Sequence, residues 1–200
     1  MRTATLIVTV ACCLTAACGS SAPEALPASS PAPAATTSEV TGTVPRNAIV
    51  TLLPAQPAPM PEGPAVMDQY AKQFVPNVLY VRVGQPVEFR NSEDMPHNVT
   101  VMRRGTGGEV FNVSTEPQQK YVHTFDRVGQ FDVTCDIHPG MQATLIATQS
   151  PLATIADDGG RFSLPNVQVG SYKLSLTYEG RTVEQPLDVA GARTEIRVKQ

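Results

Sequence analysis

The stretch Gly129-Gln130-Phe131-Asp132-Val133-Thr134-Cys135-Asp136-Ile137-His138-Pro139-Gly140-Met141 joins a strand pattern to a cluster of metal-binding side chains. Phe131, Val133 and Cys135 alternate with polar residues, and this period of two predicts a half-buried strand with Cys135 on its inward face. Cys135, His138 and Met141 then follow at steps of three in one tight loop. We therefore expect a thiol, an imidazole and a thioether to lie close together after the strand.

A second histidine completes a plausible ligand set. His97 lies in Met95-Pro96-His97-Asn98-Val99, at the mouth of another predicted strand. A thiolate, two imidazoles and a thioether are soft donors that suit copper, with Cys and two His in a plane and a weak axial Met. Zinc is the rival metal, although it prefers four strong donors and binds thioether poorly. Calcium and magnesium require oxygen ligands, which this set lacks.

The sequence around these residues predicts an all-β structure. Short runs rich in β-branched and aromatic residues recur between Gly and Pro turns, as in a sandwich or barrel. The one exception is the segment from Met67 to Phe74, for which we expect a short helix. His123 lacks a partner at metal-ligand spacing, and we interpret it as a strand residue. The runs predicted as strands are 78–83, 86–90, 99–102, 109–113, 120–125 and 130–135.

Residues 66–149 resemble a cupredoxin, the blue type 1 copper fold of the amicyanin and plastocyanin type. The resemblance rests on Met95-Pro96-His97-Asn98-Val99 and on Phe125 to Met141, and the two-residue gaps on both sides of His138 are amicyanin-like. It implies a Greek-key sandwich that holds one copper ion, cycling between Cu(I) and Cu(II) in outer-sphere electron transfer. The metal ligands that it implies are His97, Cys135, His138 and Met141.

The C-terminal residues 150–200 predict a second β-unit. Phe162 and Leu164, and then Tyr172 and Leu174, alternate with polar residues, and the Asp158-Gly159 pair predicts a tight hairpin turn. The stretch resembles the carboxypeptidase regulatory-like domain, a small transthyretin-like β-sandwich that is a structural or binding module. Because residues 150–200 alone offer a thin core, we expect strands within residues 39–65, namely 40–44 and 48–53, to pair with them.

The N-terminus predicts export. Arg2 precedes an uncharged run from Ala4 to Ala17 that is too short to span a bilayer, so residues 1–17 are expected to be a signal peptide. Small residues before Cys18 resemble a bacterial lipoprotein processing site, which favours a lipid on Cys18, while ordinary cleavage is the alternative. Residues 18–38 predict a disordered Ser/Ala/Pro-rich tether. We therefore expect a periplasmic or extracytoplasmic protein that is anchored to a membrane.

Composition excludes several classes of function. The formal net charge is −3, so the chain has no excess of basic residues, which argues against nucleic acid as a partner. The three histidines are too few for a multinuclear copper oxidase centre. Three of the four cysteines lie within the first 18 residues, so the body of the chain has one thiol and no internal disulfide. No nucleophile triad or paired acid and base motif is present, so an enzyme is not expected.

These observations favour a monomeric electron carrier with a redox protein partner, such as a cytochrome or a copper oxidoreductase. One alternative is an extracytoplasmic copper carrier or chaperone that does not transfer electrons. The other is a scaffold module with a vestigial copper site. Asn98 either pins the Cys loop to the His97 loop or is an ordinary turn residue. Glu93, Asp94 and Asp136 form either an acidic rim that steers a basic partner or a set of ordinary solvated charges.

Overall fold

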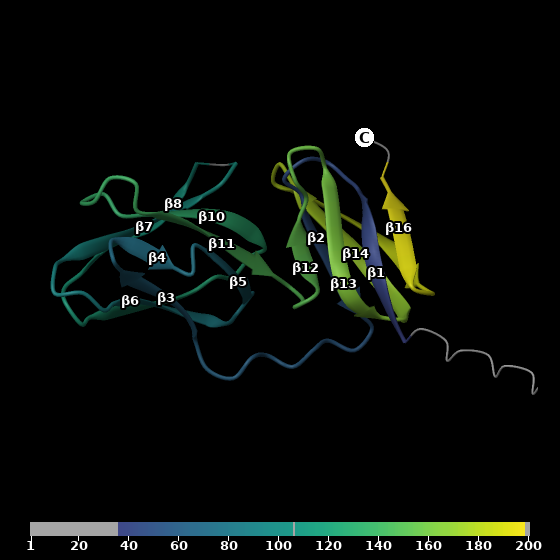
Figure 1. The fold of residues 1–200 in the computed structure, drawn as a ribbon, viewed down its shortest axis with the longest axis horizontal. Helices are drawn as coiled ribbons and strands as arrows, with labels where there is room; N and C mark the ends of the chain where they lie inside the picture. Colours follow the sequence, from purple (N-terminus) through teal and green to yellow (C-terminus); the bar gives the residue numbers. More distant parts are fainter. Residues whose placement is uncertain (1–35, 106, 199–200) are drawn as a thin grey trace, which may run out of the picture. The chain divides into compact units, whose positions relative to one another are not determined.

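The computed structural model describes residues 36–105 and 107–198, and every regular element in these ranges is a β-strand (Figure 1). The expected signal peptide, the lipid site at Cys18 and most of the expected tether lie outside the described residues. None of the described residues belongs to a helix long and apolar enough to span a membrane. The all-β fold class is confirmed, and the strands assemble into two separate pairs of sheets.

The nine strands between residues 65 and 148 form the first pair of sheets. The five-stranded sheet has the order β5-β11-β10-β7-β8, and the four-stranded sheet has the order β4-β3-β6-β9. Their bounds are β3 Ala65–Tyr70, β4 Gln73–Val75, β5 Val78–Arg82, β6 Pro86–Asn91, β7 His97–Arg103, β8 Glu109–Thr115, β9 Lys120–Thr124, β10 Gly129–Thr134 and β11 Gln142–Thr148.

Inward-facing side chains from both sheets form one core in this sandwich. Phe89 on β6, Val101 on β7, Phe131 on β10 and Leu145 on β11 are almost fully buried in it. Phe131 and Val133 are buried while their neighbours are more exposed, as the period of two predicts for β10. Cys135, directly after β10, belongs to the same buried cluster. The core therefore positions the residue on which the predicted metal site depends.

The helix expected between Met67 and Phe74 is wrong, because this segment forms a β-hairpin. Strands β3 and β4 pair antiparallel across a turn in which Ala71 and Lys72 both have positive φ. That backbone geometry belongs to the tight turns whose twist suits a hairpin. Met67 and Gln69 are both completely buried, so the true period in β3 is two. Burial on one face of a sheet therefore overrides the weak helical pattern.

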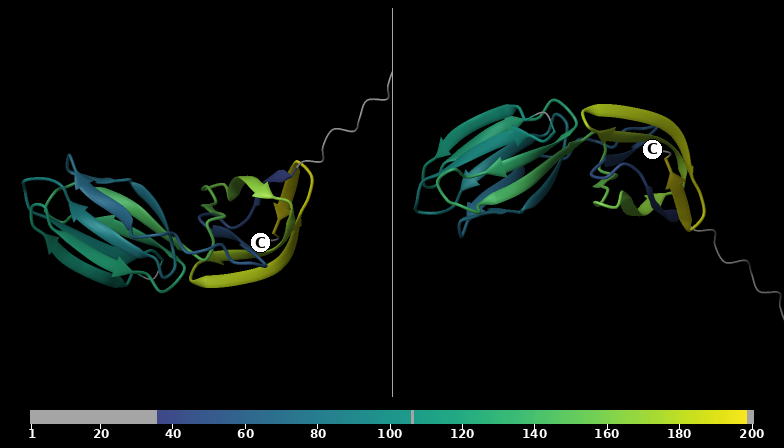
Figure 2. Two further views of the ribbon diagram at one scale, coloured as in Figure 1. Left: turned by 90° about the horizontal axis from the view of Figure 1, so that it is seen from below. Right: turned by 90° about the horizontal axis from the view of Figure 1, so that it is seen from above.

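The remaining strands form the second sandwich, in which N-terminal and C-terminal segments share both sheets. The three-stranded sheet has the order β13-β1-β16, and the four-stranded sheet has the order β12-β2-β14-β15. Figure 2 shows the dark blue N-terminal strands beside the green and yellow C-terminal strands. The bounds are β1 Thr37–Thr43, β2 Ile49–Pro54, β12 Ala153–Ile155, β13 Arg161–Gln168, β14 Gly170–Tyr178, β15 Arg181–Val189 and β16 Arg193–Arg197.

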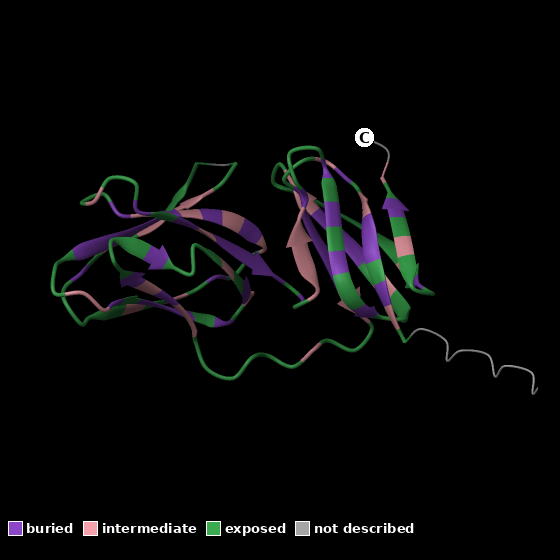
Figure 3. Cartoon of the chain, in the orientation of Figure 1, coloured by how far each residue is buried: buried purple, intermediate pink, exposed green. Residues whose placement is uncertain are grey.

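The expected pairing of residues 40–53 with the C-terminal stretch is confirmed by this register. β1 pairs antiparallel with β13 and parallel with β16, and β2 lies between β12 and β14. A Cβ atom on Gly42 would lie 2.2 Å from the backbone oxygen of Ile196, so the close approach of β1 and β16 requires a glycine. Buried and exposed residues alternate along β13 (Figure 3). The N-terminal strands thus complete the core that residues 150–200 alone would lack.

Leu52→Ala on β2 should destabilise the second sandwich by about 2–5 kcal/mol, because the leucine is fully buried in its core. Amide hydrogen exchange should then rise in β13 and β14 while β7 and β10 stay protected. Leu53→Ala, at a half-buried position next along the strand, is the matched control and should cost much less. Equal loss of protection in β7 and β10 would contradict the assignment of β2 to a separate core.

Candidate metal centre

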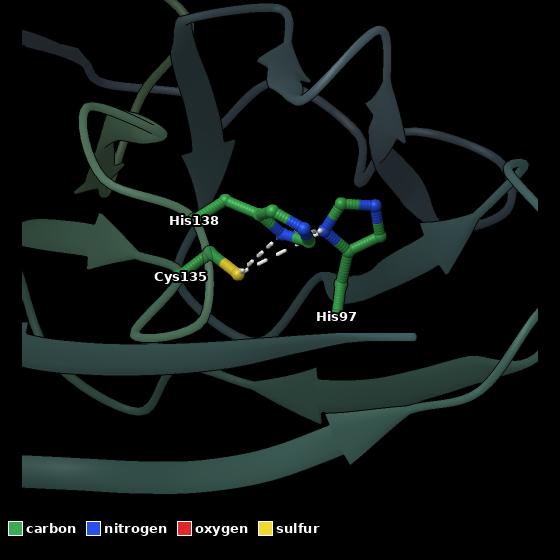
Figure 4. A group of neighbouring side chains, drawn as sticks. All are labelled: His97, Cys135 and His138. Atoms are coloured by element: carbon green, nitrogen blue, oxygen red, sulfur yellow. Dashed lines mark hydrogen bonds between the residues drawn. The ribbon is translucent and has the colours of Figure 1, made fainter. Parts of the chain in front are cut away.

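Three side chains converge at one end of the five-stranded sheet. His97 is the first residue of β7, Cys135 follows the last residue of β10, and His138 lies in the loop between β10 and β11. Because β7 and β10 pair antiparallel, with Thr134 opposite Thr100, the start of one strand lies beside the end of the other. Figure 4 shows the Cys135 sulfur facing both imidazole rings. The sheet register therefore brings together residues far apart in the sequence.

The donor atoms have the spacing that a single ion requires. Cys135 Sγ lies 3.8 Å from His97 Nδ1 and 3.7 Å from His138 Nδ1, and the two Nδ1 atoms are 3.0 Å apart. Nitrogen and sulfur ligands sit about 2.0–2.3 Å from a bound transition metal, so two donors to one ion lie at most about 4.4 Å apart. All three separations satisfy this limit. The residues present therefore fit one soft metal ion.

A carboxylate fixes the orientation of the His97 ring. His97 is fully buried, and its Nε2 lies 2.9 Å from Glu93 Oε2. A proton on Nε2 donates to this carboxylate and leaves the Nδ1 lone pair facing Cys135, which is the tautomer a metal ligand needs. Burial raises the pKa of Glu93, but hydrogen bonds from His97 and from the Lys72 backbone N–H lower it, with a net decrease. Glu93 is therefore held as an acceptor.

Buried amides hold the backbone of the His97 loop. Asn91 donates through Nδ2 to the carbonyl oxygens of Met95 and Thr115, at 2.9 Å and 2.8 Å. Gln69 donates to the carbonyl oxygen of Asn98 and accepts from the Thr115 hydroxyl. Asn91 and Gln69 are completely buried. Since a buried polar group without a partner costs free energy, this network specifies one conformation of the loop that carries His97.

The Cys135 loop is closed by its own backbone. Cys135 N–H donates to the carbonyl oxygen of Met141 at 3.1 Å, and Met141 N–H donates to that of His138 at 3.3 Å. Met141 is 2 % exposed and belongs to the same buried cluster as Cys135. The structure thus brings together the donor atoms of His97, Cys135 and His138, and the axial role of Met141 stays a prediction.

Asn98 joins the two loops, as expected of a positioning residue rather than of an ordinary turn residue. Its Oδ1 accepts from the backbone N–H of Asp136 at 2.7 Å, and its Nδ2 donates to Asp136 Oδ2 at 2.9 Å. Thr100 and Asn112 also donate to that carboxylate oxygen. The hydrogen bond from Thr100, followed by that from Asn98, lowers the pKa of Asp136 despite the opposing effect of burial.

Neither alternative for Glu93, Asp94 and Asp136, an acidic rim or a set of ordinary solvated charges, describes all three residues. The Glu93 carboxylate faces His97 and the Asp136 carboxylate faces Asn98, so two of the three act within the structure of the site. Asp94 is exposed. The sequence does contain one sign of the contact between Glu93 and His97, because Glu93 lies four residues before the histidine. Spacing alone does not say which way a loop side chain turns, so the sequence offers no more than a candidate.

His123 lies outside the group of convergent donors, as predicted. It belongs to β9, and its ring centroid lies 4.7 Å from that of Phe111 and 4.8 Å from that of Phe125. Burial among these rings lowers the pKa of His123, and the carboxylate of Asp126 opposes the decrease. A neutral imidazole packs well in such a seam. His123 therefore fills a structural role where the edge strands β8 and β9 approach.

Comparison with known proteins identifies similar chains over this sandwich. The model of the family described as "Copper binding proteins, plastocyanin/azurin family" matches residues 64–148. Amicyanin of Paracoccus denitrificans is 32 % identical over 95 residues, which are 46 % of this chain and 72 % of the relative. Plastocyanin of Ginkgo biloba is 30 % identical over 84 residues, which are 38 % of this chain and 85 % of the relative.

Solved structures are also similar to this chain. A reduced amicyanin variant is 26 % identical, with a TM-score of 0.40, and the match covers 50 % of this chain and 98 % of that one. An oxidised amicyanin variant is 27 % identical with the same TM-score and coverage.

Glu93→Gln should weaken copper binding by about 10–100-fold, because an amide holds the His97 tautomer less firmly than a carboxylate does. Competition with a chromophoric copper chelator measures the change. Asp94→Asn is the matched control, since it removes an equal charge from the next residue without touching His97, and it should leave the affinity within about twofold. Equal losses in the two variants would contradict the positioning role of Glu93.

Proposed function

The chain belongs, through residues 64–148, to the plastocyanin/azurin family of copper-binding proteins, and we propose that it is an electron carrier that transfers one electron at a time. The observation that carries this proposal is the convergence of the donor atoms of Cys135, His97 and His138 next to a buried apolar core. A carrier of this kind works best when its ligands move little between oxidation states. The buried and hydrogen-bonded surroundings of these three residues support such rigidity.

In this proposal His97, Cys135 and His138 hold the ion, and Met141 supplies a weak fourth ligand. When bound, copper supplies the change between Cu(II) and Cu(I). The chain does the rest: β7 and β10 hold two ligands in register, and the amide network around Asn91 fixes the loop before His97. The apolar cluster around Cys135 and Met141 excludes water from the sulfur side. An electron carrier, rather than an enzyme, is the function that this arrangement favours.

The surface around His138 suits a redox protein partner. His138 is half-buried while its loop neighbours Pro139 and Gly140 are exposed. Ile137 is 52 % exposed and Met95 is 36 % exposed, so apolar side chains lie on both loops of the site. Weak redox encounters use small interfaces, which such a patch can provide. We propose that the electron passes through the exposed edge of the His138 ring.

The rest of the chain supports an extracytoplasmic, membrane-anchored protein in this proposal. Arg2, the apolar run that follows it and the small residues before Cys18 favour export and attachment of a lipid to Cys18. The second sandwich, completed by β1 and β2, fits a structural or binding module similar to the carboxypeptidase regulatory-like domain. We propose domains at residues 66–149 for copper and at 39–65 with 150–200 for this module.

Cys18→Ser should move the protein from the membrane fraction to the soluble fraction when the full chain is expressed in a bacterium that processes lipoproteins. The thiol is the site to which the lipid would be attached, so serine prevents anchoring. Detergent partitioning and the mass of the mature protein measure the outcome. Cys12→Ser, within the predicted signal peptide, is the control and should leave the lipidated mass unchanged. A soluble wild-type protein of unlipidated mass would refute the anchor.

Copper-loaded wild-type protein should bind one ion per chain and show an intense visible absorption band, because a thiolate bound to Cu(II) transfers charge in this range. Cys135→Ser should abolish the band while the second sandwich keeps its fold. Absorption spectra, metal analysis and a reductive titration make the test. A colourless Cu(I) form without a reversible couple would favour the copper carrier, tighter binding of zinc would favour a zinc site, and loss of all metal binding would favour the scaffold.

Met141→Gln tests the proposed role of Met141 separately from those of the three other residues that would hold the ion. The variant should keep the visible band and lower the reduction potential, because an amide oxygen is a harder donor than a thioether and favours Cu(II). Met60→Gln, at an exposed loop position, is the control and should leave the potential unchanged. An unaltered potential in Met141→Gln would remove Met141 from the ligand set without affecting the roles of His97, Cys135 and His138.

A further inference from the structure

Asp136, the residue directly after Cys135, is held by three neutral side-chain donors. Its Oδ2 accepts from Thr100 Oγ1 at 2.7 Å, from Asn98 Nδ2 at 2.9 Å and from Asn112 Nδ2 at 3.1 Å. Its backbone N–H donates to Asn98 Oδ1 at 2.7 Å. The carboxylate is therefore fixed against β7 and β8, although the residue itself lies at the surface.

This carboxylate carries a charge that the described part of the chain does not neutralise. Glu88 pairs with Arg90 and Lys120, and Asp132 pairs with Arg104. Asp136 forms no ion pair with any described residue, and its three donors are an alcohol and two amides. Hydrogen bonds from neutral groups hold a carboxylate in place without cancelling its net charge. The field of Asp136 therefore acts on whatever lies beside it.

The metal centre lies beside it. The Cα atoms of Asp136 and Cys135 are about 3.8 Å apart as chain neighbours. Asn98, which holds the carboxylate, directly follows His97. The charge thus belongs to the residue next to one convergent donor and is held by the residue next to another, and charges in solution are screened over a Debye length of about 8 Å at physiological salt. Asp136 is exposed, so solvent screening weakens this interaction.

We propose that Asp136 is a fixed negative charge that stabilises the oxidised form of the centre and so sets a lower reduction potential. The inference rests on the function proposed above. Reduction adds one electron, taken from a redox protein, and no bond between Asp136 and the centre forms or breaks. Because the oxidised centre carries one more positive charge than the reduced centre, a nearby anion stabilises it more. Asp136 is a positioning and tuning residue in this role, not a metal ligand.

Asp136 could change the reduction potential through its charge or through its hydrogen bonds, which tie the Cys135 loop to β7 and β8. The experiment must distinguish these two effects. Asp136→Asn removes the charge and keeps the size of the side chain. Asn112→Lys keeps Asp136 and its hydrogen bonds from Thr100 and Asn98, removes the one from Asn112 itself, and places a cation next to the carboxylate, at an exposed position on β8. A charge role predicts that both variants raise the potential by an amount that shrinks as salt is raised, whereas a mechanical role predicts shifts that salt leaves unchanged.

The experiment measures the reduction potential of copper-loaded protein by spectroscopic redox titration. In Asp136→Asn and in Asn112→Lys the ratio of oxidised to reduced protein at a fixed solution potential should fall several-fold, a tenfold fall being about 59 mV for one electron. The shift should shrink as salt is raised. Asp126→Asn is the matched control, because it removes the same charge from the turn before β10, at the far end of that strand from Cys135.

The outcomes separate this inference from the proposed function. A wild-type protein without a visible band or reversible couple overturns both. A normal wild-type couple with unshifted potentials in Asp136→Asn and Asn112→Lys overturns the inference alone, as does an equal shift in Asp126→Asn. If Asp136→Asn does not load copper, Asn112→Lys decides the question. Thermal unfolding of the copper-free proteins measures the contribution of the loop bonds, and the conservative Asp136→Glu should restore the wild-type potential in large part.

Discussion

The antiparallel pairing of β7 with β10 is the constraint on which the metal centre depends. It places the first residue of one strand beside the residue that follows the other, so that His97 meets Cys135 at one end of a single sheet. A slip of one residue in this register would turn the Cys135 thiol away from the core, because side chains alternate between faces. Phe131 and Val133, buried on the same face, hold the register that the site requires.

The buried polar groups around the site serve specificity more than stability. Gln69, Asn91 and Thr115 satisfy one another and the loop carbonyls, and they do so inside an apolar core. Replacing the whole network by apolar side chains need not cost stability, whereas breaking part of it leaves buried groups without partners. The network therefore selects one loop conformation. A centre built from preformed ligands needs that selection, because donor atoms that moved on electron transfer would slow it.

The sequence predicted the parts of the fold and site that depend on spacing. Cys135, His138 and Met141 share one short loop, and the alternation before them predicts the inward face of β10. His97 could be named from donor chemistry as a candidate, but its place beside Cys135 depends on the fold, because nothing local says that its loop meets the Cys135 loop. The hairpin from β3 to β4 was missed because a short apolar segment fits a helix and a strand equally well, and tertiary burial decides between them.

The roles of Glu93 and Asp136 were missed for a different physical reason. Both side chains belong to loops, where direction depends on backbone turns and on the partners that other strands present. Asp136 turns toward β7 and β8 because they offer it three donors, and Glu93 turns toward His97 because a buried ring nitrogen needs an acceptor. Both residues could be singled out from composition as charges near a site. Only the folded arrangement of the strands shows that their partners are parts of the site itself.

The second sandwich explains how one chain can carry the copper site without distorting either core. Strands β2 and β12 are antiparallel neighbours, with Ala153 opposite Thr51, so the chain leaves and re-enters this sandwich at adjacent strands. Strands β3 to β11, which lie between them in the sequence, pair only with one another. The entropic cost of closing a loop grows only slowly with its length, so a segment of this size with neighbouring ends adds little to the cost of folding the outer sandwich. Each core can therefore keep its own register, which the geometry of the metal ligands demands of β7 and β10.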